Sequence, residues 1–75
     1  MNIQERDNQN AITWIDSEIE EFARNVGTRN ASAAATSVIT LAFMLRVIDE
    51  NEHRHYRARI EQIYASYNAS LTSAA

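Results

Sequence analysis

The chain has 75 residues, a net charge of −3 and no cysteine, which makes it a single small domain and excludes disulfides and thiolate metal sites. One glycine and no proline exclude a hairpin-rich β architecture, because tight turns need residues that tolerate positive φ or preset it. We therefore predict an all-α fold, and self-association, since so short a chain buries only about 60% of its unfolded surface alone.

The first ten residues, MNIQERDNQN, are polar or charged. A signal peptide needs an apolar segment in this region, so we expect no export by that route. The lack of cysteine also favours the reducing cytoplasm. Both ends of the domain, residues 1–7 and 69–75, are expected to be frayed.

A first amphipathic helix is predicted over about residues 8–26. Gly27 follows directly, and glycine accepts the left-handed conformation that closes a helix C-terminus. Trp14 projects about 120° from the apolar stripe of this helix, and its exposure would predict a second interface. The stripe itself recurs at spacings of three and four and consists of Ile12, Ile15, Ile19, Phe22 and Val26.

A second, longer helix is predicted over about residues 31–68, antiparallel to the first in a helical hairpin. At 100° per residue its apolar side chains fall within about 40° of one line on both sides of the charged segment ENEHR. The shared phase favours one continuous helix. The alternative is a three-helix bundle with a break near residues 49–53, because Asp49 and Glu52 match a D-x-x-E capping box. The line of apolar residues consists of Ala31, Ala34, Val38, Ala42, Leu45, Tyr56, Ile60, Ile63 and Tyr67.

The hairpin leaves apolar side chains uncovered, because residues beyond about 49 have no neighbour from the first helix. Phe43 and Met44 also point away from that helix. We therefore expect a homo-oligomer, a dimer packed as a four-helix bundle, and contact with another protein. Aromatic and methionine side chains dominate such contacts, so the candidate partner-binding residues are Trp14, Phe43, Met44, Tyr56 and Tyr64.

The longest uncharged run, Asn30 to Leu45, has sixteen residues, several of them small or polar. A membrane-spanning helix needs about 20 mostly apolar residues. We therefore expect no membrane insertion.

The segment EHRHYRAR carries the densest positive charge in the chain. Arg54, Arg57 and Arg59 could contact nucleic acid, which makes a dimeric nucleic-acid-binding regulator the alternative function. On a helix, however, these three side chains spread around the axis and form no single basic face. Ion pairing with the acidic segment DSEIEE of the first helix is the competing interpretation.

No group of side chains predicts catalysis, a metal site or a cofactor site. His53 and His55 lie about 200° apart on a helix, so they cannot share one metal ion. One glycine cannot build a phosphate-binding loop. The sequence therefore predicts a small non-enzymatic interaction protein: an adaptor, a chaperone-like partner or an inhibitor of a larger complex, of a kind typical of phage- or plasmid-encoded factors.

Overall fold

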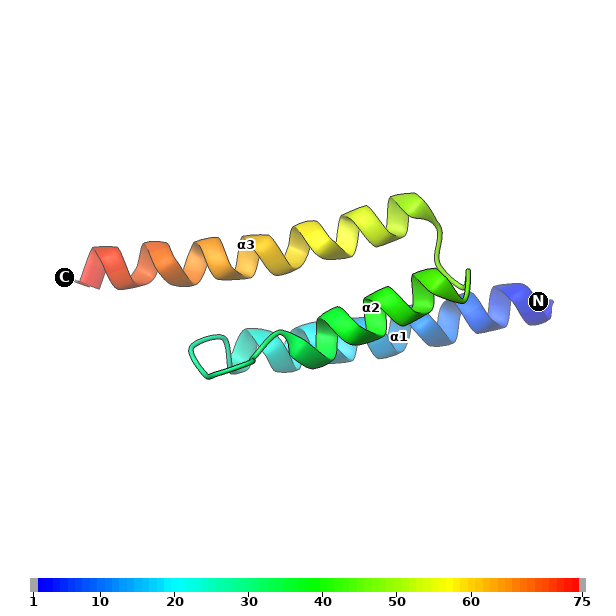
Figure 1. Ribbon diagram of the computed structural model, residues 1–75, viewed down its shortest axis with the longest axis horizontal. Helices are drawn as coiled ribbons and strands as arrows, with labels where there is room; N and C mark the ends of the chain where they lie inside the picture. Colours follow the sequence, from blue (N-terminus) through cyan, green and yellow to red (C-terminus); the bar gives the residue numbers. More distant parts are fainter. Residues whose placement is uncertain (1, 75) are drawn as a thin grey trace.

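The computed structural model describes residues 2–74, which form three α-helices: α1 (Ile3–Arg24), α2 (Ala33–Met44) and α3 (Glu50–Ala74). Each helix runs antiparallel to the next, so α1 and α3 point in the same direction (Figure 1). The molecule is elongated, with extents of 52 × 19 × 19 Å. The predicted all-α fold is confirmed.

The expected continuous helix over residues 31–68 is wrong, because the chain reverses in the segment 45–49, which we call the hinge. Arg46 has a φ of 61°, the left-handed conformation of a Schellman motif. Its N–H donates to the Phe43 carbonyl at 3.0 Å, and the N–H of Val47 donates to the Ala42 carbonyl at 3.0 Å. These bonds satisfy carbonyls that a continuing helix would have used.

The start of α3 has the capping box that the sequence offered as its alternative. The N–H of Glu52 donates to Asp49 Oδ1 at 2.8 Å, and the N–H of Asp49 donates to Glu52 Oε1 at 2.9 Å. Two amides without helical partners are thereby satisfied. The three-helix arrangement is therefore the one adopted, with its break just before the predicted segment 49–53.

The outer helices are longer than the sequence predicted. In α1 the helix begins at Ile3, because the side chain of Asn2 accepts a hydrogen bond from the Glu5 N–H at 2.7 Å. At the other end α3 continues to Ala74. Residues 1 and 75, which belong to the expected frayed ends, lie outside the described residues.

The predicted role of Gly27 as a left-handed helix cap is wrong. Helix α1 ends at Arg24 with Asn25 as its cap, and Gly27 does not have positive φ. Its lack of a side chain is needed for another reason: a Cβ at this position would lie 2.5 Å from the Tyr67 hydroxyl. Gly27 therefore lets the ring of α3 approach the turn that follows α1.

The core lies along α2, between the two outer helices. Helix α3 folds back on it, which buries apolar side chains that a two-helix hairpin would leave in water. The first turns of α1 and the last turns of α3 extend beyond opposite ends of the bundle (Figure 1). The buried apolar residues are Ile15, Ile19, Phe22, Ala35, Ile39, Ala42, Ile48, Tyr56 and Ile60.

Candidate interaction surface

Trp14 lies on the side of α1 that faces away from α3. Asp16 approaches α3, since its carboxylate Oδ1 lies 3.3 Å from Arg59 Nη1. Residues two apart on a helix point about 200° apart. Trp14 therefore projects from the opposite side, and its side chain is exposed.

Leu41 of α2 and Leu45, the residue that caps the C-terminus of α2, share this orientation. Phe43 faces α3, because its ring stacks on His53 with centroids 4.3 Å apart and planes at 19°. Leu41 and Leu45 each lie two residues from Phe43, so both point away from α3. They are also an i, i+4 pair, which places them beside each other on one face of the helix.

Trp14 and Leu41 lie at the same level of the bundle. The side-chain amide of Asn8 donates to the Val47 carbonyl at 2.7 Å, which sets the register of α1 against the end of α2. Trp14 follows Asn8 by six residues and Leu41 precedes Val47 by six, so antiparallel helices keep the two level.

We call the exposed apolar set on α1 and α2 the outer face, made of Trp14, Leu41 and Leu45. Their exposed fractions are 59%, 51% and 65%. Large apolar side chains gathered at this exposure mark interaction sites in soluble proteins. The sequence analysis identified Trp14 but missed Leu41 and assigned Leu45 to the covered stripe. The spacing of two from Phe43 is the signal that identifies both leucines.

Among the other predicted partner-binding residues, Met44 is the most exposed at 71%. It lies at the end of α2, directly before the hinge. Phe43 is partly buried by its stacking on His53 and by the core. Met44 is therefore available to a partner, whereas Phe43 is largely occupied within the chain.

Tyr56 is a core residue with an exposed fraction of 6%, so it does not contribute to a surface of this chain as the sequence analysis expected. The reason is that α3 folds back and turns this side chain inward. Tyr64 lies at the edge of the core. Its ring packs on Phe22, and its hydroxyl donates to Ser32 Oγ at 2.9 Å.

The three predicted nucleic-acid contacts are not brought together. Arg59 forms an ion pair with Asp16 between α3 and α1, which is one of the complementary-charge contacts considered from the sequence. Arg54 and Arg57 are exposed on α3, and Glu50 and Glu61 line the same shallow hollow as both of them. The local charge is therefore mixed.

Tyr56 and Glu21 have shifted pKa values that follow from their contacts. Burial raises the pKa of Tyr56, and the carboxylates of Asp16 and Glu52 raise it further. The pKa of Glu21 is lowered, first by the hydrogen bond from Arg24 and then by the one from Asn25. Contacts within the chain account for both pKa shifts.

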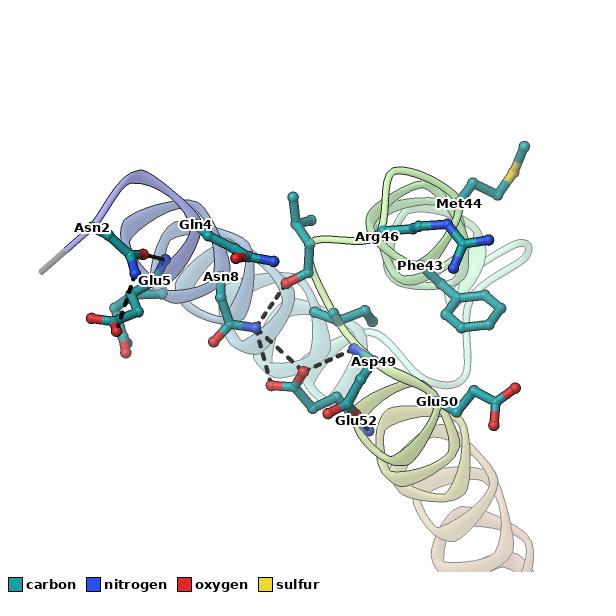
Figure 2. A pocket seen from close by; sticks show the side chains of 13 residues that line it. Asn2, Gln4, Glu5, Asn8, Phe43, Met44, Arg46, Asp49, Glu50 and Glu52 are labelled. Atoms are coloured by element: carbon teal, nitrogen blue, oxygen red, sulfur yellow. Dashed lines mark hydrogen bonds between the residues drawn. The ribbon is translucent and has the colours of Figure 1, made fainter.

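A recess of about 1080 Å³ opens where the first turns of α1 meet the hinge (Figure 2). The amide of Asn8 spans it, contacting the Val47 carbonyl and both carboxylate oxygens of Glu52 at 3.3 and 3.2 Å. These hydrogen bonds fasten the hinge and the start of α3 to α1. Within residues 2–74, no buried side-chain nitrogen or oxygen lacks a hydrogen-bond partner.

Two further searches of the described residues gave no site. Their Asp, Glu and His side chains form no group of three or more that is able to hold a metal ion. None of their helices combines the length and the hydrophobicity needed to cross a membrane.

Comparison of the chain with protein-family models, with curated proteins and with solved structures gave no match.

Proposed function

We propose that the chain is a small cytoplasmic interaction protein without enzymatic activity, which acts as a homo-oligomer and binds a larger protein as an adaptor, a chaperone-like partner or an inhibitor. The observation that carries this proposal is the outer face. Trp14, Leu41 and Leu45 are each more than half exposed, and tryptophan is among the residue types most enriched at the centres of interfaces.

The total surface of the chain supports self-association. A compact monomer of 8.5 kDa exposes about 4,650 Å², whereas this chain exposes 5513 Å². The excess of roughly 850 Å² matches the ~800 Å² that each partner contributes to an interface of standard size. Contact with a second copy over such an interface would lower the exposed area of each chain to about that of a compact monomer.

The alternative of a nucleic-acid-binding regulator has less support. Arg59 is paired with Asp16, and acidic side chains lie beside Arg54 and Arg57. Affinity for a phosphate backbone requires several unopposed positive charges on one surface. The two arginines that remain do not provide such a surface.

The proposal is tested by measuring the mass of the chain by light scattering during size exclusion over a range of concentrations. Trp14 is the only tryptophan, so its fluorescence reports on the outer face directly. We expect association to shift the Trp14 emission to the blue. We also expect Leu41→Glu to abolish both the association and the shift, because it places a charge in the contact.

The matched control is Leu71→Glu, which makes the same change at another exposed leucine near the end of α3. This variant should associate as the unaltered chain does. A monomer at every concentration, or equal loss of association in both variants, would overturn the assignment of the outer face as the self-association surface.

A further inference from the structure

We propose that the hinge at residues 45–49 opens, that α2 and α3 then join into one helix, and that two copies of the chain associate by exchanging their third helices. Each α3 would pack on α1 and α2 of the second copy with the contacts it now makes within its own chain. This inference rests on the proposed self-association and adds an exchange of helices to it.

The apolar pattern is compatible with the opened form. The line of apolar residues identified in the sequence stays within about 40° when the helix is continued through the hinge. In the closed chain, Ala42 of this line is buried in the core and Val38 packs against the core. In the exchanged dimer each joined helix would be covered by two copies of α1. The α1 of its own chain would cover the apolar residues in α2, and the α1 of the second copy would cover those in α3.

The pairing of α2 with α3 is also preserved by the exchange. Phe43 and His53, whose rings stack, lie five residues before and after Ile48. Thr36 and Ile60, which line one small hollow, lie twelve residues before and after it. Two long antiparallel helices that cross at Ile48 would place Phe43 on His53 of the second copy, with every such pair retained.

The hinge contains one residue, Arg46, whose unfavourable left-handed backbone conformation would be lost on opening. Arg46 has a φ of 61°, and for a residue with a side chain the left-handed conformation costs roughly 1–2 kcal/mol. Glycine is the usual residue at this position of a Schellman motif. An arginine here keeps the closed turn while favouring a continuous helix more than glycine would.

The exchange uses the side of α2 that carries Phe43. Leu41 and Leu45 point away from that side and are each more than half exposed. They therefore remain on the outer face of each half of the exchanged dimer.

Other contacts hold the closed form and are given up on opening. They are the capping box of Asp49 and Glu52, and the hydrogen bond from Asn8 to the Val47 carbonyl. Opening without a second copy would lose these bonds and expose α3. The exchange therefore depends on protein concentration, and a dilute chain is closed.

A matched pair of substitutions at Arg46 tests the inference. Arg46→Gly and Arg46→Ala remove the same charge, but glycine favours the left-handed turn and alanine favours the continuous helix. Because each dimer contains two hinges, we expect the dimer Kd, measured by light scattering, to be roughly 100-fold or more higher for Arg46→Gly than for Arg46→Ala. Equal Kd values for the two variants would overturn the exchange.

A second measurement locates α3 without altering the hinge. Thr40 and Arg57 line the same hollow between α2 and α3, and the chain has no cysteine of its own. After oxidation, the dimer fraction of the variant Thr40→Cys/Arg57→Cys should run as a covalent dimer on a non-reducing gel. A dimer fraction that yields only internally linked monomers would overturn the exchange, while self-association through the outer face would stand.

Discussion

The ring of Tyr64 meets the ring of Phe22 edge-on, with centroids 4.9 Å apart and planes at 61°. This contact joins α3 to α1, as the ion pair of Arg59 with Asp16 also does. The Tyr64 hydroxyl adds a hydrogen bond to Ser32 Oγ at the start of α2. One side chain of α3 therefore touches both other helices, and the residue supports the bundle from its edge.

Substitution of Tyr64 should separate the ring contact from the hydroxyl contact. We expect Tyr64→Phe to lower the free energy of unfolding by about 0.5–1 kcal/mol, because one partly exposed hydrogen bond is lost. Tyr64→Ala should cost about 2–3 kcal/mol, because the aromatic pair and its buried area are lost as well. Urea unfolding followed by circular dichroism measures both values. Equal losses for the two variants would show that the ring contributes nothing.

The contact of Asn8 with the hinge should require an amide side chain, because the amide acts as a hydrogen-bond donor. In Asn8→Asp, a carboxylate would face the Val47 carbonyl and the Glu52 carboxylate in place of a donor. We expect a loss of about 1–3 kcal/mol in the free energy of unfolding at neutral pH. The control is Asn10→Asp, a change of the same charge at an exposed position of α1. If both variants lose the same stability, net charge and not the contact at the hinge is responsible.

Alkaline conditions should destabilise the fold through Tyr56. Its pKa is raised above the ordinary value of about 10, mainly by burial. The folded chain therefore keeps this proton at a pH where the unfolded chain has released it. The stability contribution is fully present below about pH 10 and is lost as the pH rises towards the folded pKa. Thermal unfolding from pH 8 to 11.5 should show a steeper loss for the unaltered chain than for Tyr56→Phe, and parallel curves would contradict this expectation.

Gly27 should be sensitive to a side chain because of Tyr67 and not because of its φ. In Gly27→Ala the new Cβ would meet the Tyr67 hydroxyl at 2.5 Å, which outweighs the usual gain of about 0.4–1 kcal/mol from a less flexible unfolded chain. We expect a lower melting temperature. Removing the hydroxyl in Tyr67→Phe should reduce the penalty of Gly27→Ala by about 0.5–1 kcal/mol. Strict additivity of the two changes would show that the ring and the turn do not touch.

Several features of the fold follow from local sequence and were predicted correctly. The all-α class follows from the scarcity of glycine and proline. The core face of α1 follows from its spacing of three and four, and Ile15, Ile19 and Phe22 are buried as that spacing predicts. The capping box at Asp49, which the sequence offered only as the alternative to a continuous helix, is also local, because its two partners are three residues apart. Each of these signals lies within a few turns of one helix.

The break between α2 and α3 was decided by the tertiary structure. The apolar line runs in phase through the hinge, so the helical pattern alone favours continuity. Folding back buries Tyr56 and Ile60 against the rest of the core, and that burial compensates for the left-handed conformation of Arg46. The spacing of apolar residues indicates where a helix forms locally, but it carries no information on contacts between distant residues.

The same distinction explains the candidate surface. The sequence by itself determined the amphipathic helices, their antiparallel order and the exposure of Trp14, because these depend on side-chain spacing around one axis. Only the tertiary structure placed Tyr56 in the core and Leu41 at the level of Trp14 on the outer face. Those outcomes depend on which side of α2 the third helix covers, and that choice is made by the packing of all three helices together.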